Sequence, residues 1–556
     1  QVNDNLVEEG KKETADNGET ISGETNSDTN GDGDDGGDGG ETDQDRQDHE
    51  DDTEDPLQTN KRKERLNIIL FYADDWTANV LGKMNEHVKT PNIDAMADNG
   101  VLFTDNCVIS SVCWMSRASL HTGTYVSRNL QLDPHTDNMF KTHPWKETLW
   151  PKLKRAGYYT GLVGKWHAPQ PPDEMREAFD WSRFYYGFHE EQRPDGTVDH
   201  ITAKNRRDSI QFLNERPPDQ NFFLKVSFFA THAIDGHYPS YIPMNGTREK
   251  HYPDSLGDLP KPKTATQRHW EGLPSVIFRD SNEGRNRWRK RFEPDYFQDN
   301  IRDLYSLATE VDWAVGDIMA ELKKTDEEAY NNTLFIFTTD NGNLHGEHGL
   351  AEKWYPFEES LRVPLVIQDP RMSESVRGTV EDAMTLNIDL TPTILAAAGL
   401  KPSSFMQGRD MAPLYLDQSN NEDTKIVTTK SRRITSSTIN EKKNEPIINT
   451  TRRNWRQEWF YEFNMGKDIE NATDHQFIHF IDASFALITK DWKYVHWPVQ
   501  NFEQLYHRSL DKYDEWDMLH VELNNETNPA ETVQTTDAIY YDMKQRFARM
   551  KKRAQS

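Results

Sequence analysis

The stretch LNIILFYADDW (residues 66–76) decides the fold class of this chain of 556 residues. Its first eight residues are almost all apolar, and the run ends abruptly at two aspartates. A short apolar run bounded by polar residues is typical of a strand that is buried on both faces, as in a parallel sheet. The stretch therefore predicts a central strand with Asp74 and Asp75 at its carboxyl end.

The same pattern recurs along the chain, with helical segments between the apolar runs. It predicts strands at 66–73, 158–164, 221–230, 333–339 and 363–369, and helices at 91–100, 148–157 and 389–400. This alternation indicates an α/β fold with a largely parallel sheet. Near the end of the chain, residues 485–498 predict an antiparallel strand pair and residues 537–553 a closing helix, which together form a smaller C-terminal unit.

Composition excludes several classes of protein. The net charge is -28, but residues 1–60 alone hold 21 acidic against 3 basic residues, so the rest is only mildly acidic and a nucleic-acid partner is not expected. With only Cys107 and Cys113, the chain has no disulfide framework. Since no apolar run has the length of a membrane-spanning helix, we expect a soluble protein without a membrane span.

Domain organisation follows from the same features. We expect a disordered acidic tail at 1–60, a catalytic domain at 61–430 and a C-terminal subdomain at 431–556. Residues 240–295, rich in Pro, Arg and Trp, predict a long insertion or binding loop. The chain begins at Gln1 and carries sequons at Asn245, Asn331, Asn449, Asn471 and Asn525. We therefore expect a glycoprotein from which a signal peptide has been removed, secreted, periplasmic or in the lumen of the secretory pathway.

Polar residues follow four of the predicted strands. They are Asp74 and Asp75, Lys165 and His167, His232, and Asp340 and Asn341. In an open α/β sheet, ligands bind at the carboxyl ends of the strands, so these side chains are expected to meet. Three carboxylates and an amide oxygen suit Ca²⁺, with Mg²⁺ also possible, and the Lys and His residues would offset the charge of a tetrahedral anion.

The segment SSVCWMSRASLHTG (110–123) carries the most specific signal. It resembles the signature of type I sulfatases, Cys-x-Pro/Ala-Ser-Arg followed by an apolar pair and Thr-Gly. Other segments are similar to that family: TPNIDAMADNGVLFTDN (90–106), GYYTGLVGKWH (157–167), TTDNGNLHGEHGLAEKWYPFEESLRVPL (338–365), LNIDLTPTILAAAGL (386–400) and MQGRDMAPL (406–414). The joint match covers roughly residues 65–520.

This resemblance implies an alkaline-phosphatase-like fold, with a large mixed sheet flanked by helices, and a sulfatase that hydrolyses a sulfate ester. It implies that a formylglycine-generating or other sulfatase-maturating enzyme converts Cys113 to formylglycine (3-oxoalanine), whose hydrate is the nucleophile. The implied metal ligands are Asp74, Asp75, Asp340, Asn341 and the modified Cys113. Arg117 would hold the hydrate and His167 would deprotonate it. Lys165, His232 and Lys353 would contact the sulfate, with His232 or Lys353 protonating the departing oxygen.

Three departures from the family pattern bear on function. Met115 stands where Pro or Ala is usual, His121 stands at a usually apolar position, and residues 231–237 alter a His-x-Pro-His element. His237 and His345 are candidate substrate contacts. The Arg-rich stretch NEGRNRWRKRF (282–292) suits an anionic sugar, which favours a sulfated saccharide over a small aryl sulfate, or it forms a solvated helix face.

Two alternatives to a sulfatase remain open on the sequence. One is a phosphonate or phosphodiester hydrolase of the same superfamily. The other is an inactive binding protein in which Cys113 stays unmodified or pairs with Cys107.

Overall fold

A large mixed sheet forms the centre of the computed structural model. The model describes residues 65–129, 145–168, 173–279, 281–416, 454–464, 481–520 and 536–556. Within these ranges eight strands form this sheet, in the order β13-β2-β12-β9-β1-β8-β4-β5. Their bounds are β1 Asn67–Ala73, β2 Val101–Phe103, β4 Tyr159–Gly164, β5 Trp181–Phe184, β8 Phe222–Ser227, β9 Thr333–Thr339, β12 Leu365–Gln368 and β13 Thr379–Glu381.

Strand direction is uniform at the centre of this sheet. β1 pairs in parallel with β8 and β9, and β4 pairs in parallel with β5 and β8. β12 runs antiparallel to β9 and β2, which makes the sheet mixed. Because β9, β1, β8 and β4 are parallel neighbours, their carboxyl ends lie at one edge of the sheet.

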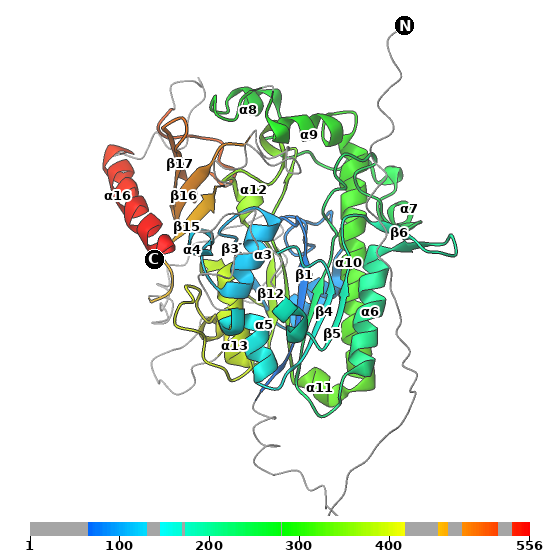
Figure 1. The fold of residues 1–556 in the computed structure, drawn as a ribbon. Helices are drawn as coiled ribbons and strands as arrows, with labels where there is room; N and C mark the ends of the chain where they lie inside the picture. The colour runs from blue at the N-terminus through cyan, green and yellow to red at the C-terminus, as the bar shows by residue number, and fades with distance from the viewer. Residues whose placement is uncertain are drawn as a thin grey trace, which may run out of the picture. The chain divides into compact units, whose positions relative to one another are not determined.

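Helices cover both faces of the sheet, so every residue of β1 is buried. Ile69 and Phe71 belong to one hydrophobic cluster and Ile68 and Leu70 to another, as strand alternation requires. The first face is covered by α2 (Pro91–Asp98), α6 (Ile201–Glu215) and α10 (Phe297–Thr325), and the second by α5 (Leu149–Arg155) and α13 (Leu390–Ala397). Figure 1 shows α6 and α10 on one side of the strands and α5 and α13 on the other.

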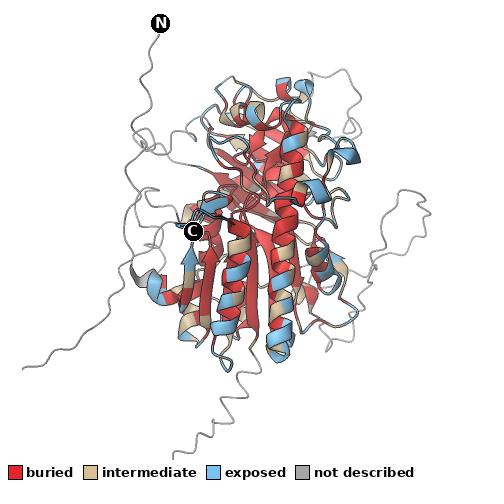
Figure 2. Cartoon of the chain, turned by 90° about the vertical axis from the view of Figure 1, so that its right-hand side faces the viewer, coloured by how far each residue is buried: buried red, intermediate tan, exposed pale blue. Residues whose placement is uncertain are grey.

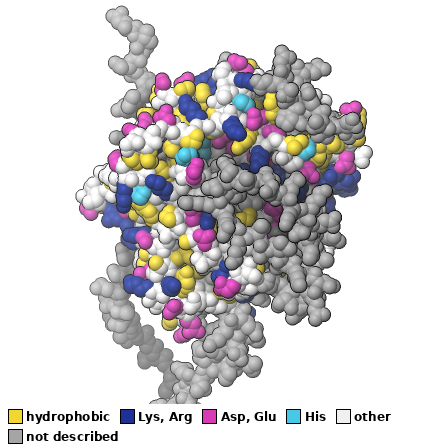
Figure 3. Space-filling model, turned by 180° about the vertical axis from the view of Figure 1, so that it is seen from behind, with side chains coloured by type: hydrophobic (Ala, Val, Ile, Leu, Met, Phe, Trp, Pro, Cys, Tyr) yellow, Lys and Arg dark blue, Asp and Glu magenta, His cyan; other side chains and the backbone are white. Residues whose placement is uncertain are grey.

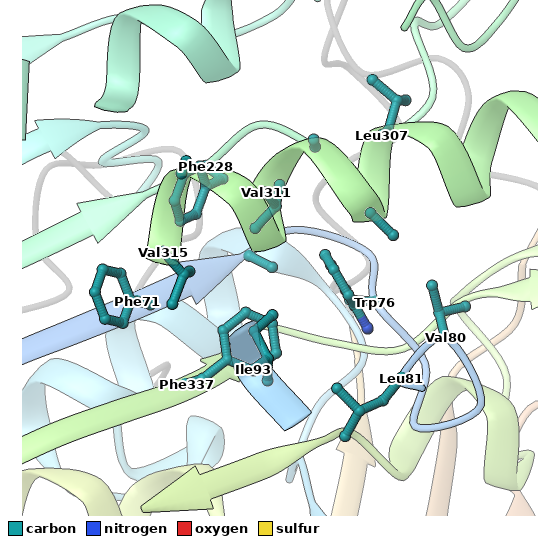
Figure 4. Packing of buried hydrophobic residues seen from close by; sticks show 14 of the residues in the cluster. Phe71, Trp76, Val80, Leu81, Ile93, Phe228, Leu307, Val311, Val315 and Phe337 are labelled. Carbon is teal, nitrogen blue, oxygen red and sulfur yellow. The ribbon is translucent and has the colours of Figure 1, made fainter. Parts of the chain in front are cut away.

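The packing of α10 on the sheet explains the length of this helix. Figure 4 shows Val311 and Val315 of α10 over Phe71 and Phe337 of the sheet. Trp76, which follows β1, meets Phe337 edge to face at 5.3 Å between ring centroids. The central strands β1, β8 and β9 are buried throughout, whereas the helices over the sheet have both buried and exposed faces (Figure 2). Burial of one apolar face therefore stabilises a helix of 29 residues.

A second, antiparallel sheet lies in the C-terminal part of the chain. Its order is β15-β16-β17-β18 and its bounds are β15 Glu458–Phe463, β16 Ser484–Thr489, β17 Trp492–Trp497 and β18 Phe502–His507. The closing helix α16 (Thr536–Gln555) packs on it through Met543, Phe547 and Met550. Figure 1 shows α16 beside β15, β16 and β17.

The sequence predictions of the fold class are confirmed. The five predicted strands correspond to β1, β4, β8, β9 and β12, and the three predicted helices to α2, α5 and α13. The strand pair and the closing helix are also present. The predicted tail at 1–60 and the boundary at residue 430 lie outside the described residues. The helices α6 and α10 were not predicted.

The region 240–295 contains short helices between stretches of loop. They are α7 (Thr247–His251), η3 (Asp254–Leu256), α8 (Gln267–Glu271) and α9 (Glu283–Arg291). None of the helices that the structure describes is long and apolar enough to cross a membrane. On the face shown in Figure 3, basic and acidic side chains are interspersed.

Candidate active site

The polar residues that follow the central strands meet at one edge of the sheet. Asp74 and Asp75 follow β1, and Asp340 and Asn341 follow β9. Lys165 and His167 follow β4, and His232 lies beyond β8. All seven side chains are buried or nearly so. The structure therefore brings together the groups that the strand-end argument selected.

Asp75 accepts hydrogen bonds at both carboxylate oxygens. Oδ1 accepts from Asn341 Nδ2 at 2.6 Å and from Lys353 Nζ at 2.5 Å. Oδ2 accepts from Asn343 Nδ2 at 3.0 Å and lies 3.5 Å from His232 Nε2. The backbone of Asp75 has a φ of 54°, a left-handed conformation that is uncommon for a non-glycine residue. The surrounding contacts hold this conformation, which directs the carboxylate into the site.

Arg117 joins two other carboxylates. Its Nε donates to Asp340 Oδ2 at 2.7 Å, and its Nη2 donates to Asp74 Oδ2 at 3.2 Å. Nη1 donates to Ser227 Oγ at 2.7 Å and to the carbonyl oxygen of Lys165 at 3.0 Å. Lys165 Nζ also pairs with Asp74 Oδ2. Although burial would raise the pKa of Asp74, the charges of Lys165 and Arg117 hold it well below its ordinary value.

Cys113 is the first residue of helix α3 (Cys113–Thr122), which begins after the extended residue Val112. The first helical bond runs from Ser116 N to Val112 O, so the N–H groups of the first three residues have no intrahelical acceptor. The helix ends at Gly123, whose φ of 66° is the left-handed conformation typical of a helix C-terminus. Burial raises the pKa of the Cys113 thiol well above its ordinary value, with Lys353 and Lys165 opposing. The unmodified side chain is therefore a neutral thiol.

The donor set fits a hard divalent cation. Potential ligand atoms of Asp74, Asp75, Cys113 and His232 all lie within 4.8 Å of one another. Asp74 Oδ1 and Asn341 Oδ1 are buried and make no hydrogen bond within the described part of the chain. A buried oxygen without a partner is costly unless a cation or water satisfies it. Since carboxylate and amide oxygens dominate, the site suits Ca²⁺ or Mg²⁺.

His167 provides a neutral imidazole at this edge. Burial, with Lys165 and Arg117 close by, lowers its pKa well below the ordinary value. At neutral pH the ring is therefore uncharged and can accept a proton. It stacks on Tyr186 at 5.8 Å between ring centroids.

His232 and Lys353 approach Asp75 from separate segments. His232 Nδ1 donates to the carbonyl oxygen of Ala233 at 2.6 Å, which leaves Nε2 directed toward the carboxylate. Lys353 follows the short strand β11 (Ala351–Glu352), which pairs with β10 (Leu344–His345). Burial would lower the pKa of Lys353, but Asp75 raises it well above its ordinary value. At neutral pH Lys353 is thus a cation that carries a proton.

The two predicted substrate contacts lie in different surroundings. His237 is exposed, and its Nδ1 donates to the carbonyl oxygen of Pro239 at 3.0 Å. His345 is buried against Phe292, and burial lowers its pKa to about 3. Neither residue contacts the groups around Asp75 in any described hydrogen bond, so their role in binding substrate stays a prediction.

Asn343 and Ser227 are functional candidates that the sequence did not reveal. Asn343 orients Asp75, and Ser227 orients Arg117. Asn343 lies two residues beyond a predicted ligand, and Ser227 is the last residue of β8. Their positions at strand ends were a usable signal, but Ser and Asn are so common at strand ends that the signal is weak.

The structure also explains how the unusual residues are accommodated. Met115 is buried in the first turn of α3, where its backbone N–H has no helical partner, so a proline at this position would remove no helical hydrogen bond. His121 stacks on Trp166 at 4.6 Å and accepts a hydrogen bond from Trp150 Nε1 at 3.2 Å. His121 Nε2 lies 3.5 Å from Nζ of the buried Lys225. This histidine therefore has polar partners that an apolar residue could not serve.

Comparison with known proteins relates this geometry to a family. A family model described as Sulfatase matches residues 66–400. The N-acetylglucosamine-6-O-sulfatase of Bacteroides thetaiotaomicron is 26% identical over 415 residues, which cover 64% of this chain and 72% of that protein. The extracellular sulfatase SULF-1 homolog of Drosophila melanogaster is 29% identical over 411 residues, which cover 68% of this chain and 34% of that protein.

A solved structure has a similar fold. It is that of BT4656 in complex with its substrate D-glucosamine-2-N,6-O-disulfate, with a TM-score of 0.62 and 19% sequence identity. The similarity covers 88% of this chain and 98% of that one. At this identity the likeness concerns the fold alone.

Proposed function

We infer that this chain, which belongs to the sulfatase family of the alkaline-phosphatase-like superfamily and hydrolyses sulfate esters, acts on a sulfated saccharide. We also propose that Cys113 is the residue converted to formylglycine. The observation that carries the proposal is the position of Cys113. It is buried at the start of α3 and has its Sγ within 4.8 Å of ligand atoms of Asp74, Asp75 and His232.

The family implies a metal ion and a formylglycine in general terms. We assign the ion to Asp74, Asp75, Asp340 and Asn341 and infer that it is Ca²⁺ or Mg²⁺, because the donors are oxygens. A bound cation of this kind polarises the oxygens of a sulfate ester. A formylglycine hydrate supplies one hydroxyl for attack and a second through which the enzyme regenerates itself.

The chain's own residues then have separate tasks. Arg117 holds Asp74 and Asp340 at fixed positions through its two hydrogen bonds. Neutral His167 accepts the proton of the attacking hydroxyl. Lys165 and Lys353 supply positive charge for the sulfate, and the N–H groups at the start of α3, which have no acceptor within the helix, favour an anion there. His232 or Lys353 protonates the departing oxygen.

A saccharide leaving group is supported by two independent features. The Bacteroides relative is named for a sulfated N-acetylglucosamine, and the solved neighbour is in complex with a disulfated glucosamine. In this chain, Tyr186 stacks on His167 while 56% of its surface stays exposed. An exposed aromatic face beside a catalytic group can pack on a sugar ring.

The cell compartment and the maturation partner are part of the same proposal. The Drosophila relative is named as extracellular. Two of the five sequons, at Asn245 and Asn331, lie on exposed residues of the described structure. We infer a secretory route, on which a formylglycine-generating or other sulfatase-maturating enzyme acts on Cys113 before α3 is buried.

The modification of Cys113 is the test of the mechanism. Mass spectrometry of the peptide that contains Cys113 should show formylglycine in active enzyme, and specific activity on 4-nitrophenyl sulfate should scale with the converted fraction. Cys113→Ala should abolish turnover, because Ala provides no nucleophile. Phenyl phosphonate monoesters serve as the control substrate. Fully active enzyme with only free Cys113, or a preference for the phosphonate, would overturn the proposal.

A further inference from the structure

The Arg-rich helix α9 is the feature of the sequence that the proposed function does not use. Two of its arginines, Arg287 and Arg291, are buried, with only 10% and 5% of their side chains exposed. They are one helical turn apart and therefore lie on one face of the helix. Of the two alternatives for this stretch, the solvated helix face is therefore wrong for these two residues.

Both guanidinium groups bind the same two carboxylates. Arg287 Nη1 donates to Glu352 Oε1 at 2.9 Å and also bonds Asp235 Oδ1. Arg291 Nη1 bonds Glu352 Oε1, and its Nη2 donates to Asp235 Oδ1 at 3.3 Å. The four side chains therefore form a closed network, which we call the arginine bridge.

The arginine bridge joins the two segments that carry the candidate proton donors. Asp235 lies three residues after His232, and Glu352 immediately precedes Lys353. Glu352 has a φ of 73°, a conformation that a non-glycine residue adopts only when its surroundings hold it. Its buried carboxylate is bound by two cations, which fixes the backbone from which Lys353 reaches Asp75.

Close packing of α9 on β11 supports the same role. A Cβ added at Gly284 would lie 2.9 Å from the carbonyl oxygen of Ala351 and 2.4 Å from Tyr355 Oη. Only glycine lets the helix approach the strand so closely. The helix is thus seated on the segment that its arginines hold.

The charges argue against a subsite for an anionic substrate group at this place. Arg287 also pairs through Nε with Glu283 at 2.8 Å. Within the described chain, the two guanidinium groups therefore face three carboxylates, those of Asp235, Glu283 and Glu352. A second sulfate or carboxylate would have to displace one of them, so the network is better suited to holding the protein's own groups.

We infer that the arginine bridge positions His232 and Lys353 relative to each other, so that the departing oxygen of the sulfate ester is protonated as the S–O bond breaks. Arg287, Arg291, Asp235 and Glu352 are positioning residues, since they act through their neighbours. The inference rests on the proposed function, but it holds whichever of the two groups donates the proton.

The dependence of kcat/KM on the leaving group distinguishes this role from general stabilisation of the fold. 4-Nitrophenolate leaves readily without a proton, whereas phenolate needs one. Asp235→Asn should lower kcat/KM for phenyl sulfate about tenfold more than for 4-nitrophenyl sulfate, because a misplaced acid loses part of the usual 10²- to 10⁴-fold benefit. Arg291→Gln should show the same selectivity, and Asp235→Glu should restore part of the phenyl sulfate activity.

The controls keep the inference falsifiable. Asp235 has 55% of its side chain exposed, so Asp235→Asn should fold even if Arg291→Gln does not. Lys290→Gln removes a charge from an exposed position of the same helix and should leave kcat/KM unchanged for both substrates. Equal losses on both substrates, or no loss on either, would overturn the positioning role. Absence of any sulfatase activity in the wild-type enzyme would instead contradict the proposed function.

Discussion

At the scale of single residues, the site depends on carboxylate oxygens that each serve several partners. Asp75 Oδ1 accepts hydrogen bonds from both Asn341 and Lys353. Asp74 Oδ2 forms ion pairs with both Arg117 and Lys165. In each case a neighbouring oxygen, Asn341 Oδ1 or Asp74 Oδ1, is left for a cation. The side chains that donate to these two carboxylates therefore leave one oxygen of Asp74 and one of Asn341 available to a metal ion.

Substitution of Asp75 tests the metal assignment. Asp75→Asn should remove the rise in melting temperature that added Ca²⁺ produces in the purified wild-type enzyme, because a ligand stabilises only a fold that binds it. Activity should fall at least about a hundredfold. Asn343→Ala is the matched comparison, since Asn343 only orients Asp75, and we expect a 10- to 100-fold loss of metal affinity. A full Ca²⁺ effect in Asp75→Asn would contradict the assignment.

At the scale of helices and strands, the sequence predicted those elements whose pattern is unambiguous. β1 and β9 are buried throughout, mostly apolar and followed directly by acidic residues, so both the strands and the ligands after them could be found. The helix α10 could not be separated from the irregular region before it, because its first turns follow an Arg- and Pro-rich stretch. The arginine bridge escaped prediction because its four residues come from three separate segments, which only the folded chain brings together.

The buried carboxyl group of Glu462 should make the stability of the fold depend on pH. Glu462 of β15 is buried and accepts a hydrogen bond from Ser127 N at 2.7 Å, and burial raises its pKa to about 7. An unfolded chain loses this proton near the ordinary value of about 4.5, whereas the folded chain retains it until about pH 7. Between these values the folded state binds more protons, so stability falls as pH rises.

The matching variant is Glu462→Gln, which keeps an acceptor for Ser127 but carries no charge. Its melting temperature relative to wild type should increase from pH 5 to pH 8, as measured by differential scanning calorimetry. Glu458→Gln in the same strand is the control, because Glu458 is partly exposed and pairs with Arg546. A constant difference between Glu462→Gln and wild type across this range would show that Glu462 is ionised in the folded protein throughout.

At the scale of the whole described fold, the C-terminal sheet is tied to the catalytic part by buried ion pairs. Arg456, just before β15, donates to both oxygens of Asp389 at 2.6 and 2.7 Å. Asp389 lies at the end of the short helix η5 (Asn387–Asp389) and also accepts from the backbone N–H groups of Leu386 and Arg409. A single carboxylate therefore joins three segments that are far apart in the sequence, including the one that precedes the C-terminal sheet.

Removal of Arg456 is the strongest test of that connection. Arg456→Met preserves most of the buried volume but leaves the charge of Asp389 without its bidentate partner. Breaking a buried pair in this way costs about 3–5 kcal/mol, so the free energy of unfolding should fall by about that amount in urea titrations. Arg546→Met removes an arginine whose pair with Glu458 is partly exposed, and it should cost no more than about 1 kcal/mol. If the two variants were equally stable, the Asp389–Arg456 pair could not be what holds the C-terminal sheet against the catalytic part. Other contacts of that sheet, such as the pairs of Arg508 with Glu358 and Asp105 at 3.0 Å each, would then have to carry that role.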